Sequence, residues 1–408
     1  MSASPRIRFL ALSAGLGAAL LLACSGDDTP PDLAPSDDPA DHDVDTQVSY
    51  RIEVTEPRWV VPSDGLPAEV DVQISNANVD IVFHLDRLFM AWRTAPYHFA
   101  SEDTVLYIVS SLDGGFTWDY EGEVFLGTDM REPRFLSYRG NLQLLFFEAG
   151  DNPIAFEPVR MWRLYRHGFA DWTEPEIFVD RYEVPWRVKV RNDTAYMTSY
   201  AGEHYGGGDA IVEVYFKQST DGDTWQLVDD QPYVYAGGVS EVAFEFDADG
   251  SLWTVTRNED CDDTGCGSHV CWAPAAALGS WECPTESDPE RYDSPDMFRH
   301  GDDIYLVARR DIGGPFGPEG DLMDYSTRPK TTALYQIDKA TRTVVRLMDL
   351  PGCGDNAFPS VRRTSEHSFL MANYTSPLDE PDISWLAGQT SARGTQLYFL
   401  EITFVPEP

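Results

Sequence analysis

The chain has 408 residues, of which 42% are hydrophobic and 12% aromatic, and its 68 acidic and 30 basic residues give a formal net charge of −38. This charge argues against binding to nucleic acid or to acidic lipid surfaces, because phosphate groups need clustered Lys and Arg. Beyond the N-terminal segment, roughly 360 residues rich in Tyr, Phe, Trp and Val show no long amphipathic helix pattern, so they predict one large all-β domain.

The N-terminus carries an export pattern. Arg6 and Arg8 precede an apolar run over residues 9–22, which is too short and too early for a membrane-spanning helix. The run ends in Leu-Leu-Ala-Cys at residues 21–24, which resembles the lipobox of bacterial lipoproteins. The resemblance implies a signal peptide over residues 1–23, lipidation of Cys24, and lipid anchoring in the bacterial cell envelope at the outer membrane. A plain signal peptide is the alternative.

The stretch 24–47 is rich in Asp, Pro and Ser and has few apolar side chains, so we expect a disordered acidic tether. From residue 48 to residue 408, a pair of short apolar strands around a Gly, Asn or Asp turn recurs six times with a period of about 55 residues. The expected strand pairs are 79–83 with 88–93, 131–135 with 142–148, 184–188 with 195–200, 239–244 with 252–258, 294–298 with 304–310, and 357–361 with 369–374. Residues 49–54 are expected to complete the sheet of the last repeat.

A tight hairpin turn is predicted twice. The segment Ser-Leu-Asp-Gly-Gly-Phe-Thr-Trp spans residues 111–118, and a shorter copy spans residues 219–225. In such a turn an Asp accepts backbone N–H bonds, Gly supplies positive φ and a Trp folds back as an apolar plug. The residues concerned are Ser111, Asp113, Gly114, Gly115 and Trp118 in the first copy and Ser219, Asp221 and Trp225 in the second.

Both segments resemble the Asp-box, or BNR repeat, of the sialidase (neuraminidase) superfamily. The resemblance implies an all-β fold, a sialidase-like six-bladed β-propeller of four-stranded antiparallel blades. In such a propeller the beginnings of first strands and the ends of second strands meet around the axis on one face. The Asp-box turns lie on the opposite face, so their role is expected to be structural.

Arginine is the notable residue near the expected meeting point. The chain is poor in basic residues, yet each repeat has an Arg near an inner strand, and converging guanidinium groups would bind a carboxylate bidentately. Each single Arg could instead pair with a neighbouring acidic side chain. The candidate substrate-binding residues are Arg93, Arg131, Glu132, Arg187, Tyr200, His204, Arg257, Asp296, Arg309 and Arg310.

Two further segments resemble sialidase motifs. Residues 238–241 and 253–258 are similar to the blade that carries the Glu assisting the nucleophile and one Arg of a triad, which implies these roles for Glu241 and Arg257. Residues 373–376 look like the Tyr-Ser segment whose tyrosine is the nucleophile, here Tyr374. The chain departs from the family in lacking an Arg-Ile-Pro segment, and Asp103 is a weak match for the acid/base Asp.

Five cysteines remain after Cys24, and four of them fall within residues 261–283. For an exported protein this favours disulfides, with Cys261 to Cys266 and Cys271 to Cys283 preferred and Cys353 left free, although the sequence does not fix the pairing. The absence of a Cys-x-x-Cys pair argues against a metal site, and no cofactor is expected.

Three functions remain open. The first is a retaining exo-glycosidase, with Tyr374 and Glu241, that acts on a sialic-acid-like or other acidic sugar. The second is a carboxylate-only glycosidase of the furanosidase type, using Glu132, Glu241 and Asp296. The third is a non-catalytic surface propeller that binds glycans or a protein. A buried Tyr–Glu–Arg contact would favour the first, an isolated carboxylate pair the second and self-paired arginines the third. We expect a monomer, and the expected partner is a glycan or other small carbohydrate substrate.

Overall fold

The computed structural model describes residues 44–153, 155–203, 211–314 and 322–407. The predicted signal peptide, Cys24, most of the predicted tether and His204 therefore lie outside the described residues. Within the described ranges, no helix is long and apolar enough to cross a membrane.

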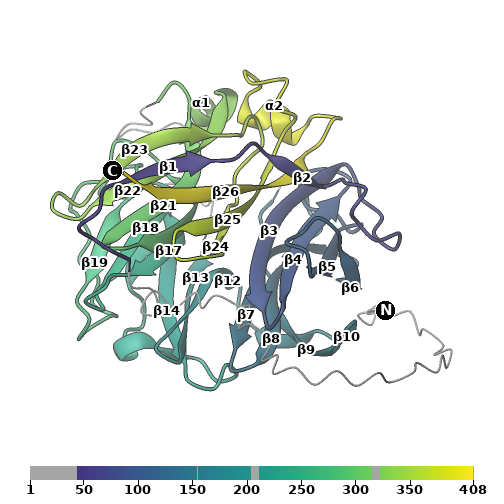
Figure 1. The fold of residues 1–408 in the computed structure, drawn as a ribbon, viewed down its shortest axis with the longest axis horizontal. Coiled ribbons are helices and arrows are strands. Elements are labelled where there is room, and N and C mark those ends of the chain that lie inside the picture. Colours follow the sequence, from purple (N-terminus) through teal and green to yellow (C-terminus); the bar gives the residue numbers. More distant parts are fainter. Residues whose placement is uncertain (1–43, 154, 204–210, 315–321, 408) are drawn as a thin grey trace.

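Six antiparallel sheets follow one another along the chain and form the blades of a β-propeller (Figure 1). This confirms the predicted fold class. In chain order, the first blade consists of β3 (Ser75–His84), β4 (Arg87–Ala95), β5 (Val105–Ser111) and β6 (Asp119–Val124). The second consists of β7 (Asp129–Tyr138), β8 (Asn141–Gly150), β9 (Arg160–Gly168), β10 (Asp171–Trp172) and β11 (Glu176–Val179). The third consists of β12 (Val184–Arg191), β13 (Thr194–Gly202), β14 (Val212–Ser219), β15 (Gln226–Leu227) and β16 (Tyr235–Gly237).

The remaining blades show where the chain closes the ring. The fourth is β17 (Val239–Phe246), β18 (Leu252–Asn258) and β19 (Val270–Ala273); the fifth is β20 (Asp293–His300), β21 (Asp303–Asp311), β22 (Lys330–Asp338) and β23 (Thr343–Leu350); the sixth is β24 (Ser360–Arg363), β25 (Ser368–Thr375) and β26 (Gln396–Pro406) with β1 (Tyr50–Val54) and β2 (Arg58–Val61). Both β1 and β2 pair with β26, so the two ends of the domain share one sheet. This confirms the placement of residues 49–54.

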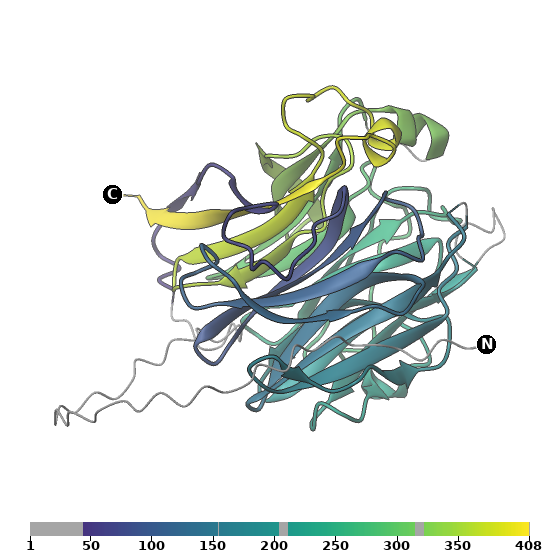
Figure 2. The same cartoon turned by 90° about the vertical axis from the view of Figure 1, so that its right-hand side faces the viewer.

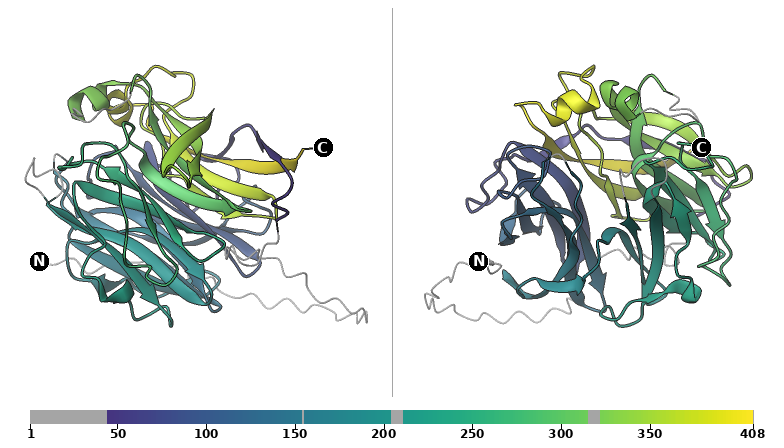
Figure 3. Two further views of the ribbon diagram at one scale, coloured as in Figure 1. Left: turned by 90° about the vertical axis from the view of Figure 1, so that its left-hand side faces the viewer. Right: turned by 180° about the vertical axis from the view of Figure 1, so that it is seen from behind.

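The innermost strands surround a common axis. Neighbouring members of the set β3, β7, β12, β17, β20 and β24 contact one another, and β24 contacts β3. Figure 2 and the left panel of Figure 3 show the blades from two sides, and the right panel of Figure 3 shows them from behind. The short helices α1 (Leu322–Thr327) and α2 (Trp385–Gln389) lie together at one edge of the ring, where the rings of Tyr325 and Trp385 are 5.6 Å apart. A 3₁₀ turn, Val228–Asp230, follows β15.

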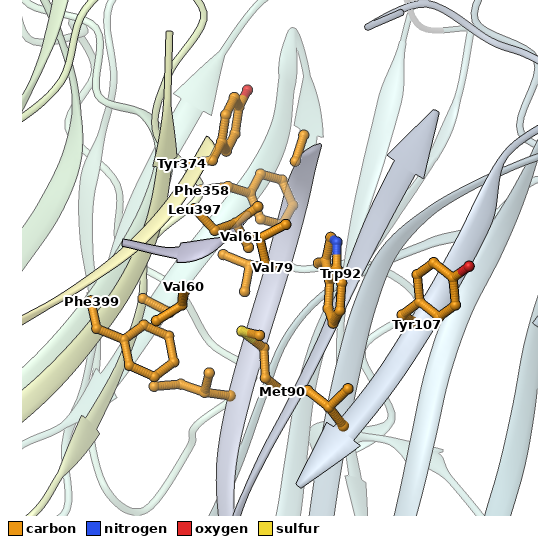
Figure 4. Packing of buried hydrophobic residues seen from close by; sticks show 14 of the residues in the cluster. Val60, Val61, Val79, Met90, Trp92, Tyr107, Phe358, Tyr374, Leu397 and Phe399 are labelled. Carbon is orange, nitrogen blue, oxygen red and sulfur yellow. The ribbon is translucent and has the colours of Figure 1, made fainter. Parts of the chain in front are cut away.

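Apolar side chains between neighbouring blades form the core. The cluster between the sixth and first blades contains Val79, Trp92 and Phe399, all at most 1% exposed (Figure 4). Close contacts within such a cluster fix the angle between blades, because protein interiors tolerate few voids. Tyr374 lies at the edge of this cluster, and Figure 4 shows its hydroxyl group pointing away from the apolar side chains.

The two predicted turns join third and fourth strands, as expected: residues 111–118 connect β5 to β6, and residues 219–225 connect β14 to β15. Asp113 accepts hydrogen bonds from the backbone N–H groups of Phe116 and Thr117, both at 2.9 Å, and these bonds hold the pKa of its carboxyl group well below the usual range. Trp118 is 5% exposed, so it acts as the predicted plug.

Two disulfides, Cys261–Cys266 and Cys271–Cys283, confirm the preferred pairing. Cys353 is buried and free of a disulfide. The second disulfide ties β19 to the loop that follows it, 12 residues along the chain.

Replacing Cys271 and Cys283 together by Ser is expected to lower the free energy of unfolding by about 2–4 kcal/mol, mainly because the unfolded chain gains freedom. Urea unfolding at equilibrium measures this change. The Cys261–Cys266 disulfide joins residues only 5 apart in sequence, so the matching double variant at these two positions is expected to lose less free energy of unfolding. Equal stability of the Cys271 variant and the native protein would contradict the prediction.

Candidate functional site

A cavity of about 740 Å³ opens at the centre of the ring, where the inner strands begin and the second strands end. Charged and polar side chains line it from all six blades. These are Asn78, Arg131, Glu132, Tyr200, Glu241, Arg257, Ser294, Arg309 and Tyr374, joined by His98 and Gln389 from connecting segments. The cavity therefore lies where the repeat pattern places the meeting point of these strands.

A recurrent bulge turns side chains toward this cavity. Five of the innermost strands, β3, β7, β12, β17 and β20, shift register within their first residues. Asn78, Glu132 and Ser294 sit at such shifts with φ values of 49°, 54° and 52°, a left-handed backbone that non-glycine residues rarely adopt. Bulges re-aim side chains and are common beside functional sites.

Three guanidinium groups from three blades face the cavity: Arg131 from β7, Arg257 from β18 and Arg309 from β21. Two of them share the carboxylate of Asp293, with Arg257 Nε 3.2 Å and Arg309 Nη1 3.5 Å from its oxygens. Asp293 also accepts bonds from Arg291 Nε at 2.5 Å and from the Tyr325 hydroxyl at 2.7 Å. Burial acts to raise its pKa, but the surrounding guanidinium charges hold that pKa below the usual range.

Arg131 is held from the other side of the cavity. Its Nε lies 2.5 Å from Asp129 Oδ2, and its Nη2 donates to the carbonyl oxygen of His98 at 2.9 Å. Arg93 bonds the other oxygen of the same carboxylate at 2.7 Å and is 1% exposed. Of these two candidate substrate-binding residues, Arg131 reaches the cavity and Arg93 lies behind it.

A chain of hydrogen bonds ends at Tyr374. Its hydroxyl donates to Asp355 Oδ1 at 2.9 Å, and Asp355 Oδ2 lies 2.6 Å from His98 Nδ1. The amide nitrogen of Gln389 is 3.1 Å from His98 Nε2. Because an amide N–H can only donate, His98 carries its proton on Nδ1 and donates it to Asp355. Burial lowers the pKa of His98, so its ring is neutral at pH 7.

Burial and the charge of Asp355 raise the pKa of Tyr374 well above 10, so the phenol is protonated at neutral pH. The sequence led us to expect Glu241 as its partner. Instead Glu241 accepts from Arg257 Nη1 at 2.6 Å and from the backbone N–H of Ser294 at 2.8 Å, which turns its carboxylate toward the fourth and fifth blades. Asp355 is therefore the carboxylate in hydrogen-bonding contact with Tyr374.

The structure separates the other sequence candidates. Tyr200 reaches the cavity together with Glu132. Asp103 is exposed on the loop that carries His98, and Arg310 points to the outside of its blade, where it pairs with Asp349 at 3.1 Å. The sequence alone does not show these placements. Adjacent residues on a strand face opposite sides of the sheet, and the sequence does not fix which side faces the cavity.

Arg187 and Asp296 form a buried ion pair at 3.4 Å within the axis of the propeller. A second pair, Arg362 with Asp80 at 3.1 Å, lies in the same region. The carboxylates of Asp296 and Asp80 also accept backbone N–H bonds from Val361 and Phe135. These contacts link different blades, so the geometry gives these residues a structural role.

Sequence reasoning missed several lining residues. Asp355 lies just before the last predicted strand pair, and nothing in the sequence indicates that His98 bonds it or that Gln389 in turn bonds His98. Apolar side chains complete the wall, with Trp385 of α2 packed 4.9 Å from the guanidinium of Arg309. The apolar lining residues are Phe99, Ala100, Pro153, Ala155, Phe156, Phe358 and Trp385. Over the described ranges, no group of three or more acidic, His or Cys side chains is placed to hold a metal ion.

No family model matches this chain, and no curated protein matches it in sequence. Solved structures share its fold at low identity. A protein of unknown function from Dyadobacter fermentans has a TM-score of 0.59 and 13% identity over 87% of this chain and 99% of its own. Trypanosoma rangeli sialidase has a TM-score of 0.57 and 12% identity, and phage phi92 endosialidase 0.56 and 10%.

The alignment covers 86% of this chain but only 59% of the Trypanosoma rangeli sialidase, and 88% of this chain and 70% of the phage enzyme. At such identities the likeness concerns the fold alone. The chain therefore has the six-bladed propeller fold that these sialidases share.

Proposed function

We propose that this protein is a sialidase-like glycoside hydrolase that removes a sialic-acid-like or other acidic sugar from a glycan. One observation carries the proposal: guanidinium groups from three blades surround a cavity that also holds a buried Tyr–carboxylate pair. The fold that the chain shares with structures named as sialidases supports it.

Arg131, Arg257 and Arg309 would bind the sugar carboxylate. A planar guanidinium offers paired N–H donors that match a carboxylate, and burial strengthens such bonds. All three arginines pair with acidic side chains (Asp129, Glu241 and Asp293), the feature expected of a non-catalytic propeller, but all three still line the cavity. In the proposed hydrolase these bonds hold the donors in place before the substrate arrives. Preorganised charge of this kind binds a substrate without a large reorganisation energy.

Tyr374 would act as the nucleophile and Asp355 as its base. A neutral phenol is a weak nucleophile, so the attack on the anomeric carbon requires the proton to leave. Asp355 already accepts that hydrogen bond, and His98 donates to its other oxygen. His98 and Gln389 are positioning residues here, because they act on the substrate through Asp355.

A second candidate is a glycosidase that uses carboxylates alone. It is favoured by Glu132 and Glu241, which line the same cavity; burial and then the charge of Glu241 raise the pKa of Glu132. In that reading Tyr374 would be a binding residue and the arginines would neutralise the acidic pocket. Comparing the activities of Tyr374→Phe and Glu241→Gln separates the two candidates.

The substrate test uses the full chain with a fluorogenic sialoside, the methyl ester of the same sialoside, and neutral furanosides and pyranosides. The sialoside is expected to be cleaved at least about 100-fold faster than its ester, because each lost charge-assisted hydrogen bond is worth about 1.5–3 kcal/mol. Equal kcat/KM on the acid and the ester, or turnover of neutral sugars only, would contradict the arginine site.

A further inference from the structure

Glu132 stands apart from the other acidic residues of the cavity. It lines the cavity, is 5% exposed, and its Oε2 has no hydrogen-bond partner among the described residues. Its backbone is held at a φ of 54° by the bulge between Arg131 and Arg134. A buried, unpartnered carboxyl oxygen and a left-handed backbone are both unfavourable, so their coincidence indicates a group kept for function.

The surroundings of Glu132 favour its neutral form. Burial, followed by the negative charge of Glu241, raises the pKa of Glu132 to about 8. The facing groups are Glu241 of β17, Tyr200 of β13, Arg257 of β18, and Arg131 and Arg134 of its own strand. The arginines act to lower the pKa, but the effect of burial exceeds theirs. At pH 7 most Glu132 side chains therefore carry a proton.

We propose that Glu132 is the catalytic residue that donates a proton to the oxygen of the leaving group, an inference that rests on the proposed hydrolase function. A carboxylic acid that is protonated at neutral pH and faces a substrate cavity is suited to this role. Asp103, the sequence-based candidate, is exposed on its loop.

The reaction balances in two steps. In the first, Tyr374 Oη bonds to the anomeric carbon and passes its proton to Asp355. The bond from that carbon to the leaving oxygen breaks, its electron pair stays on the oxygen, and the oxygen takes the proton of Glu132. In the second, water attacks the anomeric carbon and gives a proton to the Glu132 carboxylate, while Tyr374 leaves and regains its proton from Asp355.

The test compares two glycosides of the same acidic sugar, one with a nitrophenol leaving group and one with a methyl group. Nitrophenolate leaves without protonation, but methoxide does not. For Glu132→Gln, kcat/KM on the methyl glycoside is expected to fall by about 10²–10⁴-fold, with less than about a tenfold change on the nitrophenyl glycoside. This parameter reports the first step, so slower hydrolysis of the intermediate does not affect it.

The pH profile gives a second readout. On the methyl glycoside, kcat/KM of the native protein should fall as the pH rises through about 8, because the donor loses its proton. The residual activity of Glu132→Gln should lack this decline. Glu174→Gln, at an exposed position in the segment between β10 and β11, is the control and should match the native protein.

Retained cleavage of the nitrophenyl glycoside also shows that the variant is folded. Equal losses on both glycosides, or no loss on either, would overturn the role of Glu132 while leaving the hydrolase function standing. If the native protein cleaves neither glycoside, the proposed function fails and the role of Glu132 fails with it.

Discussion

Tyr374→Phe is expected to lower kcat/KM on a nitrophenyl glycoside of the acidic sugar by at least about 10³-fold. The substitution removes one oxygen atom and leaves the ring, which is 2% exposed, in its packing site. With the nucleophile gone, only binding and charge stabilisation remain, and in other hydrolases this remainder is a small part of the total acceleration. Steady-state kinetics at pH 6–7, roughly midway between the usual carboxylate and phenol pKa values, measures the effect.

Tyr398→Phe is the matched control. Tyr398 is also fully buried, on the neighbouring strand β26, and its hydroxyl contacts Asn373 and the carbonyl oxygen of Pro351. Its loss should reduce stability by about 1 kcal/mol and leave kcat/KM nearly unchanged. If Tyr374→Phe keeps activity within about tenfold while Glu241→Gln abolishes it, the carboxylate-only mechanism is correct and the tyrosine mechanism is wrong.

Asp293→Ala is expected to lower the free energy of unfolding by about 3–5 kcal/mol. The carboxylate is fully buried and bonds Arg291, Arg257, Arg309 and Tyr325. Removing it leaves buried positive charges with less compensation, and these charges lie close together. The same variant should raise KM for the acidic sugar, because Arg257 and Arg309 lose a shared anchor. Urea unfolding and steady-state kinetics measure the two effects.

Asp349→Ala provides the comparison, since this carboxylate pairs with Arg310 and Arg346 at the surface and is 44% exposed. Exposed ion pairs contribute about 0–1 kcal/mol, so little change is expected. A loss below about 1 kcal/mol for Asp293→Ala would contradict the view that this carboxylate holds the arginine group together.

The repeats made the fold predictable. Six predicted strand pairs recur at the regular spacing of a blade repeat. The first pair, residues 79–83 with 88–93, lies within β3 and β4. The early strand, residues 49–54, had no partner nearby in sequence, so it was expected in the last blade, where β1 pairs with β26. Local patterns and chain closure were sufficient for these features, because each depends on backbone pairing rather than on side-chain direction.

The detailed site was less predictable, for a geometric reason. Asp355 and Glu241 both begin inner segments, and the sequence gives no sign that the bond from Ser294 N–H turns Glu241 away from Tyr374. The bulges that aim Asn78 and Glu132 at the cavity lack a Gly that would mark a left-handed residue. Pairing between blades likewise decides that Arg187 lies in the axis while Arg131 reaches the cavity.

The tyrosine mechanism is tested most directly by identifying the residue that forms a covalent bond with the sugar. Trypanosoma rangeli sialidase, which shares the propeller fold, forms a covalent intermediate with 2,3-difluorosialic acid. Incubation of this protein with the same compound, followed by proteolysis and mass spectrometry, is predicted to show an adduct on Tyr374 that Tyr374→Phe lacks. An adduct on Glu241 or Glu132, or active-site turnover with no adduct on Tyr374, would contradict the tyrosine mechanism.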